Sequence, residues 1–234
     1  MSPPTTPSPT PAGAALRPFD VGDHACAIYS SGTQLVRLAS RFLADGIERQ
    51  EYCWSVGTRR DGVAIRAALR RRGIDVDGQI RRVALRLLLA GDVYIVRGEF
   101  DAEHAARVFR DAIEHARLEG FRGFRVAADM SWASKLTDGA ERVIAYEASA
   151  LSLFASARAT ALCLYGRRRM PLAVLNGALV THPFTSAARG QVMSNPFHDR
   201  DITVLPSVHD PEVSAKLRTL TRVAQRSARR PRHF

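Results

Sequence analysis

Residues 23–57, DHACAIYSSGTQLVRLASRFLADGIERQEYCWSVG, decide the fold class of this chain. The apolar run Ala25–Tyr29 predicts a buried strand, and apolar residues after Gly32 then recur at helical spacing. Tyr52–Val56 has the aromatic and β-branched residues of a second strand. This order of strand, small-residue loop, helix and strand is how a phosphate-binding P-loop domain begins.

The loop of this segment lacks the residues that bind nucleotide phosphates. A P-loop has the pattern G-x-x-x-x-G-K-[ST], whose amides, lysine and hydroxyl hold phosphates and Mg²⁺. Here the loop reads YSSGTQL, with Gln34 or Leu35 in place of the lysine. The two lysines of the chain, Lys135 and Lys216, are far away in the sequence. The sequence therefore favours a binding or sensing domain over an ATPase.

The remaining pattern alternates strands with helices. Because strands joined by crossover helices form parallel sheets, it predicts an α/β fold with three layers: a mostly parallel sheet with helices on both faces. The expected ligand site is the edge where the strands have their carboxyl ends. Further strands are predicted at 83–89, 93–96, 124–128, 159–165 and 189–193, and helices at 63–72, 101–119, 139–155 and 170–180.

Composition and charge divide the chain into three parts. Residues 1–16 are predicted to be a disordered Pro/Ser/Thr-rich leader, 17–207 a folded domain, and 208–234 an amphipathic helix (Asp210–Gln225) with a basic, disordered tail. We expect a cytoplasmic location and no membrane partner, because there is neither a secretory signal nor an apolar run near ~18 residues.

The positive charge is concentrated at the end of the chain. The net charge is +11, of which residues 216–234 carry +7 from one lysine and six arginines without any acidic residue. Such a tail predicts weak, salt-dependent and non-specific nucleic-acid contact. A solvated tail without a partner is the alternative.

His24 and Cys26 on one strand, and Cys163 and Tyr165 on another, are the first candidate ligand-binding residues. Residues i and i+2 of a strand point to the same face, so each pair can reach one pocket. The alternative is a hydrogen-bonded strand-end histidine beside buried thiols. A zinc site would need about four donors. His24, Cys26, Cys163 and His182 supply them only if they converge, which spacing does not establish, so the sequence predicts no metal site.

Other candidates lie after the middle strand and in the helices that follow. Asp129 and Trp132 come directly after the strand 124–128, with closure of the core edge as the alternative role of Trp132. Glu147 lies within a helix and is either exposed or paired with Arg125 or Arg142. A helix ends at His182, where an imidazole also interacts with the helix dipole.

Six segments in order resemble the MEDS family of sensory domains. The segments are Gly22–Cys26 with Tyr29, Asp129–Ala133, Tyr146–Ala148, Cys163–Tyr165, Thr181–Pro183 and Asn195–Phe197, the last interpreted as a structural turn. The resemblance implies a RecA/KaiC-like fold with a degenerate P-loop, in which Asp129 stands where a Walker B acid would. It also implies sensing of small, often hydrocarbon-derived molecules, signal transduction and transcription regulation.

We therefore expect a non-catalytic sensory domain that binds a small molecule and signals to a partner protein, such as a kinase, an anti-sigma factor or a transcription regulator. The alternative is a divergent RecA/KaiC-like nucleotide-binding protein or ATPase, with Asp129 or Glu147 on Mg²⁺ and Arg59 or Arg60 on phosphate. The sequence specifies no cofactor. The predicted ligand-binding residues are His24, Cys26, Tyr29, Asp129, Trp132, Glu147, Cys163, Tyr165 and His182.

Overall fold

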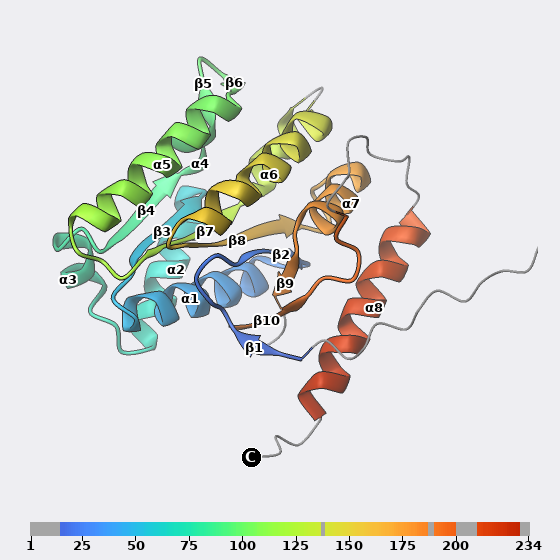
Figure 1. Ribbon diagram of the computed structural model, residues 1–234, viewed down its shortest axis with the longest axis horizontal. Coiled ribbons are helices and arrows are strands. Elements are labelled where there is room, and N and C mark those ends of the chain that lie inside the picture. Colours follow the sequence, from blue (N-terminus) through green and yellow to red (C-terminus); the bar gives the residue numbers. More distant parts are fainter. Residues whose placement is uncertain (1–14, 137–138, 187–189, 200–209, 230–234) are drawn as a thin grey trace, which may run out of the picture.

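The computed structural model describes residues 15–136, 139–186, 190–199 and 210–229. These residues form one large sheet with the strand order β1-β10-β9-β2-β8-β7-β3-β4 and a separate two-stranded hairpin, β5-β6 (Figure 1). The strands are β1 (Arg17–Pro18), β2 (His24–Tyr29), β3 (Tyr52–Gly57), β4 (Leu85–Leu89), β5 (Ile95–Val96), β6 (Glu99–Phe100), β7 (Phe124–Asp129), β8 (Ala159–Gly166), β9 (Phe184–Ser186) and β10 (Gln191–Ser194).

The six strands from β9 to β4 are parallel, and β10 and β1 add an antiparallel edge. The helices are α1 (Gly32–Glu48), α2 (Arg59–Arg71), α3 (Val76–Arg81), α4 (Ala90–Tyr94), α5 (Ala102–Leu118), the 3-10 helix η1 (Met130–Lys135), α6 (Gly139–Ser156), α7 (Leu172–Thr181) and α8 (Asp210–Arg229). The expected α/β fold with a mostly parallel, helix-flanked sheet is confirmed.

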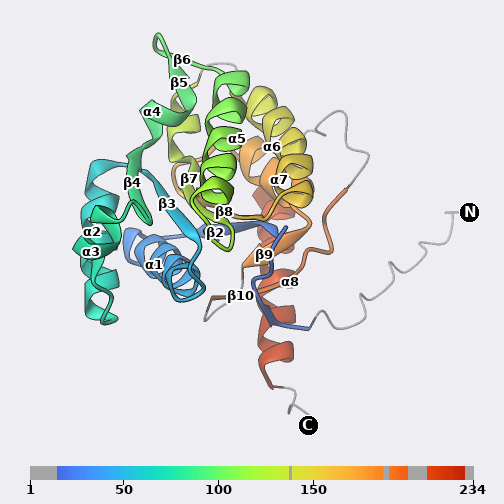
Figure 2. The same cartoon turned by 60° about the vertical axis from the view of Figure 1, so that its left-hand side comes forward.

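The helices form two groups on opposite faces of the sheet (Figures 1 and 2). One apolar core lies between the sheet and α5, α6 and α7, and a second lies between the sheet and α1 and α2. Strand residues alternate between the two cores: Ala161 and Cys163 of β8 face α6, whereas Leu162 and Leu164 face α1. Whether a residue has an odd or an even position along its strand therefore decides which of the two cores its side chain enters.

Two sequence-based expectations for the elements were wrong at their ends. The strand expected at 93–96 is divided, because Val93 and Tyr94 belong to α4 and are buried in the α5–α6 core, which leaves only β5 as strand. The helix expected to end at Gln225 continues to Arg229, so the tail predicted to be disordered from Arg226 begins as helix. The leader residues 1–14 and the end, 230–234, lie outside the described residues.

In the described part of the chain, every helix is too short or too polar to cross a membrane.

A buried ion pair joins the sheet to α1. Arg125 of β7 is fully buried and donates through Nε to the carboxylate of Glu51, which precedes β3. Its guanidinium also lies 4.5 Å from the ring centroid of Phe42 in α1. Gly46 makes room for this side chain, because a Cβ at that position would overlap Arg125. The pair fixes α1 against the centre of the sheet.

We predict that Arg125→Met lowers the free energy of unfolding by about 3–5 kcal/mol, because it leaves the Glu51 carboxylate buried without a counter-charge. Denaturant unfolding measures the change. The double variant Glu51→Gln with Arg125→Met should recover most of the loss. A cost of R125M near the roughly 1 kcal/mol of a surface ion pair would contradict this role.

Candidate functional site

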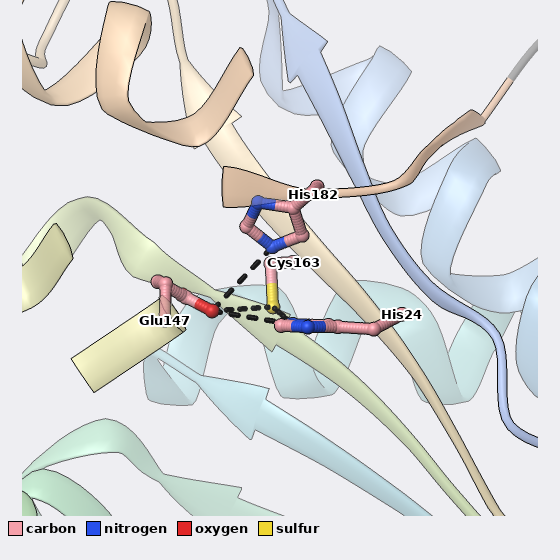
Figure 3. Close-up of side chains that lie close together, drawn as sticks. All are labelled: His24, Glu147, Cys163 and His182. Carbon is pink, nitrogen blue, oxygen red and sulfur yellow. Dashed lines mark hydrogen bonds and ion pairs between the residues drawn. The ribbon is translucent and has the colours of Figure 1, made fainter. Parts of the chain in front are cut away.

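Four side chains with metal-ligating atoms meet in the layer between the sheet and the helices α6 and α7. They are His24, Glu147, Cys163 and His182, and all four are buried (Figure 3). One donor atom from each lies within 4.8 Å of the donor atoms of the others. Three of these residues belonged to the metal set that the sequence analysis considered. Glu147 takes the place that Cys26 had in that set.

The sheet register explains why two strands contribute to the cluster. β2 and β8 are parallel neighbours, in which Cys26 is paired with Cys163 and His24 with Ala161. His24 and Cys163 therefore lie on the same face, toward α6 and α7. The cluster is not at the carboxyl edge of the sheet, where the sequence analysis placed it, because His24 is the first residue of β2.

Close packing of two helices brings the other members into reach. Glu147 lies on α6, and His182 follows the last residue of α7. Gly177 of α7 packs directly on Ile144 of α6, and a Cβ at position 177 would overlap that side chain. Only glycine allows this approach, so the helices stand close enough for Glu147 and His182 to interact.

One carboxylate oxygen is the centre of the cluster. Oε2 of Glu147 is 3.2 Å from Nε2 of His24, 3.4 Å from Nε2 of His182 and 3.7 Å from Sγ of Cys163. The other oxygen, Oε1, accepts a hydrogen bond of 2.7 Å from the hydroxyl of Tyr165. Glu147 is therefore oriented by Tyr165 and presents Oε2 to the three remaining members.

Burial and charge shift the pKa values of the cluster in different directions. Burial alone would raise the pKa of Glu147, but the neighbouring imidazoles of His182 and His24 hold it below its usual value. Burial is the main cause that lowers the pKa of His24 to about 4. Burial beside Glu147 raises the pKa of the Cys163 thiol well above its usual value. Glu147 is thus ionised at neutral pH, while His24 is neutral and Cys163 is a thiol.

The backbone around His182 fixes its ring. Nδ1 donates a hydrogen bond of 2.8 Å to the carbonyl of Ala178, one helical turn earlier. Asn195 donates to the carbonyl of His182 at 2.7 Å and to that of Leu179 at 2.5 Å. Because Nδ1 carries the hydrogen, the unpaired Nε2 faces the cluster.

A small enclosed cavity adjoins the cluster. Aromatic and apolar side chains line most of it, including Tyr94, Phe109 and Phe154, and Glu147 and Cys163 form its polar end. Its volume of about 10 Å³ holds roughly one water-sized molecule. Tyr94, Phe109 and Phe154 were not predicted as site residues, because the spacing of apolar residues does not distinguish lining from ordinary core packing.

The structure brings together only some of the nine predicted ligand-binding residues. His24, Glu147, Cys163, Tyr165 and His182 meet, and Cys26 is buried on the same face beside them. Glu147 lies paired inside the core, as one alternative had it, but its neighbours are His24 and His182 and not an arginine. It is not exposed, Arg125 pairs with Glu51, and Arg142 donates to the carbonyl of Phe100.

Tyr29 and Asp129 form a separate pair on the opposite face. The Tyr29 hydroxyl donates to Oδ1 of Asp129 at 2.9 Å, and the Ser131 hydroxyl donates to the other oxygen. Tyr29 packs in the core beneath α1, because its position in β2 has the opposite parity to His24. These two residues therefore do not contribute to the cluster.

Trp132 also lies apart from the cluster. Its ring stacks on Tyr94 at 4.6 Å between centroids and contacts Phe100 at 4.9 Å. This aromatic group covers the α4 end of the core, which is the structural role considered as the alternative. Tyr94 is the connection, since it touches Trp132 on one side and lines the cavity on the other.

The fold and the cluster define an α/β domain with a buried site of mixed nitrogen, oxygen and sulfur donors on one face of a parallel sheet. The model of the family "MEDS: MEthanogen/methylotroph, DcmR Sensory domain" matches residues 23–183, which is more than half of the chain and includes the whole cluster. The chain belongs to the MEDS family. Comparison with curated proteins gave no match.

We predict that Tyr29→Phe raises the pKa of Asp129 further. Burial already raises this pKa above 3.8, and the hydrogen bonds from Ser131 and Tyr29 oppose the rise. The stability that this raised pKa contributes is fully present below about pH 3.8 and is lost as the pH rises through the folded-state pKa. Because Tyr29→Phe raises the folded-state pKa, this stability should be lost at a higher pH in the variant. Carboxyl ¹³C titration by NMR measures it.

Asp77, which pairs with Arg66 and Arg70 on the surface, provides the control in the same spectra. Its titration should not change in Y29F. An unchanged or lowered pKa of Asp129 would contradict the role assigned to the Tyr29 hydroxyl.

Proposed function

We propose that this protein is a non-catalytic cytoplasmic sensor that binds a small, hydrocarbon-derived molecule in the cavity beside Glu147 and Cys163. The observation that carries the proposal is an enclosed apolar cavity with a polar end, inside a domain of a sensory family. Such a combination suits ligand recognition, in which apolar walls bind the carbon part and a few polar groups orient it.

The size of the cavity restricts the ligand class. Space for roughly one water-sized molecule suits a neutral compound of about one or two non-hydrogen atoms. A charged ligand would have to lose its hydration among aromatic side chains, next to a carboxylate that already requires partners. Methanol and chloromethane have two non-hydrogen atoms each, at the upper limit of this size, and both have a polar end for Glu147 or Cys163.

The helices α6, α7 and α8 connect the cavity to the surface of the domain, so a conformational change on ligand binding can be transmitted through them. Glu147 is part of α6, which packs closely on α7, and α7 in turn contacts α8. Lys216 of α8 donates to Asn176 of α7 at 2.5 Å, and Arg167 joins Asp210 at 2.8 Å. We infer that a change in the cavity alters this stack of helices, which then signals to a partner such as a kinase, an anti-sigma factor or a transcription regulator.

We predict that methanol or chloromethane shifts the ¹³C-methyl NMR signals of Ala150 and Ala161, which line the cavity, in a saturable manner. Ala39, buried in the core on the opposite face, is the internal control and should not shift. Benzene is too large for the space and should give no saturable shift at any of the three methyl groups.

Two matched variants complete this test. Ala150→Val fills the cavity and should abolish the saturable shift at Ala161, whereas Ala39→Val makes the same change on the other face and should retain it. Shifts of equal size at Ala39 and Ala161, or shifts that do not saturate, would contradict binding in the cavity.

The alternative of a nucleotide-binding protein has less support from the geometry. A RecA/KaiC-like origin agrees with the β2–α1 segment and with Asp129 at the end of β7. However, the Ser31 side chain caps α1 by accepting from the amide of Gln34, and Gln34 accepts from the amide of Ser30. Two amides of the loop, those of Ser30 and Gln34, are thus paired with side chains of the same loop, and Asp129 is paired with Tyr29. We interpret the P-loop as degenerate.

The basic end of the chain suggests an additional, non-specific contact with nucleic acid. Arg218, Arg222 and Arg226 recur every four residues on the exposed side of α8. Since each phosphate contact releases counterions, a row of three arginines would bind in a salt-dependent manner.

We predict that changing these three arginines to glutamate abolishes the retention of the protein on duplex DNA at low salt, without changing its far-UV circular dichroism. Arg107→Glu, which changes an exposed helix residue on α5, is the control and should have little effect. Undiminished retention of the triple variant would leave α8 as a solvated surface.

A further inference from the structure

The four donors of the cluster are those that a borderline divalent metal prefers. Two imidazoles, one thiol and one carboxylate form a mixed set, and zinc is bound by all three kinds of ligand in four-coordinate sites. Among magnesium, calcium and zinc, only zinc is suited to the two nitrogens and the sulfur.

The distances between the donors fit a tetrahedral ion. Zinc bonds of about 2.0–2.1 Å to nitrogen or oxygen and about 2.3 Å to sulfur separate ligand atoms by about 3.3 Å and 3.6 Å respectively. The cluster has 3.2 Å and 3.4 Å from Oε2 of Glu147 to the two imidazoles. Sγ of Cys163 is 3.4 Å from Nε2 of His24 and 3.7 Å from Oε2. Four of the six donor–donor distances are thus close to those of a tetrahedral zinc site, and the remaining two are no longer than 4.8 Å.

Electrostatics favour the same ligand. A divalent cation with one carboxylate, one thiolate and two neutral imidazoles is a neutral complex. A neutral complex has a smaller desolvation cost in the protein interior than a charged one. Without a cation, several electron-rich atoms crowd around Oε2 of Glu147. Nε2 of His182 has no hydrogen-bond partner among the described residues, although it lies 3.4 Å from that carboxylate oxygen.

The surroundings of the donors resemble those of metal ligands. A ligating histidine usually donates its other ring nitrogen to a carbonyl or carboxylate, which fixes the ring orientation. His182 does so through Nδ1 to Ala178, so that Nε2 points inward. Tyr165 holds Oε1 of Glu147 and leaves Oε2 for the metal. His24 differs, because its Nδ1 has no partner among the described residues.

We propose that His24, Glu147, Cys163 and His182 bind one divalent metal ion of the zinc type. The inference builds on the proposed function, since the cavity ends on two of the four donors and a bound small molecule would lie beside the metal. On binding, the Cys163 thiol releases its proton to solvent and the metal accepts the thiolate. Sequence spacing alone predicted no metal site, because the approach of α6 to β2 and β8 cannot be read from it.

The test uses the full chain, unfolded in guanidinium with a chelator and refolded with Zn²⁺, with Co²⁺ or without metal. After desalting, metal analysis should find about one ion per chain. The Co²⁺ form should have the visible bands of tetrahedral cobalt and a thiolate-to-cobalt charge-transfer band. Wild-type protein that refolds but retains neither metal, or that lacks the thiolate band, would overturn the proposal.

Two cysteine variants identify the sulfur ligand. Cys163→Ser should lose the charge-transfer band, whereas Cys26→Ser should keep it, although both thiols are buried and are paired in the sheet register. The opposite result would overturn the assignment of ligands. If C163S does not fold, the wild-type cobalt spectrum still decides whether a thiolate binds the metal.

Tyr165→Phe tests the role of Tyr165 as a positioning residue. The tetrahedral cobalt bands should persist while the metal affinity, measured by chelator competition, falls about 10–100-fold. Unchanged affinity would remove Tyr165 from the site.

The metal proposal and the proposed function fail separately. Saturable shifts of the Ala150 and Ala161 methyl groups in a protein that retains no metal would leave the sensor and overturn the metal site. A thiolate–cobalt spectrum without any such shift would leave the metal site and overturn the binding of a small molecule in the cavity.

Discussion

The need to neutralise the Glu147 carboxylate organises one half of this molecule. An ionised group in an apolar layer costs several kcal/mol unless charges or hydrogen bonds compensate it. The neighbours of this carboxylate come from β2, β8 and the end of α7: Tyr165 donates a hydrogen bond to Oε1, and the imidazoles of His24 and His182 lie 3.2 Å and 3.4 Å from Oε2. Elements that are distant in sequence therefore have to meet at one oxygen atom.

The other face of the sheet contains a buried carboxylate with a different solution. Glu51 has a full counter-charge in Arg125, and together they tie β7 to α1. The cluster around Glu147 contains no arginine or lysine. Its partners are groups that also bind metals or small molecules, so Glu51 has a structural role, whereas Glu147 is the carboxylate that we propose for recognition.

Sequence patterns were sufficient for the fold class and for the faces of several strand residues. The i, i+2 relation of His24 with Cys26, and of Cys163 with Tyr165, placed each pair on one face because strand geometry has a fixed period. The same rule applied along β2 puts Tyr29 on the face opposite to His24, whereas the face of Asp129 depends on the register of β7, which the sequence does not give. Glu147 was recognised as a candidate, but its partners depend on how α6 packs on the sheet.

The short elements show another limit of sequence patterns. β1 has two residues and β9 has three, and both form because a neighbouring strand is already in place. α4 takes Val93 and Tyr94 out of an apparent strand because their side chains are needed in the core beside α5. Periodicity within so few residues contains no information about such tertiary preferences.

Gly177 has a consequence for how sites of this kind diversify. Its hydrogen in place of a methyl group sets the distance between α6 and α7, and therefore the separation of Glu147 from His182. The size of residue 177 thus sets the spacing between these two donors of the cluster. A lineage could retune what its sensor recognises by exchanging small residues along the α6–α7 seam, while every side chain that touches the ligand stays the same.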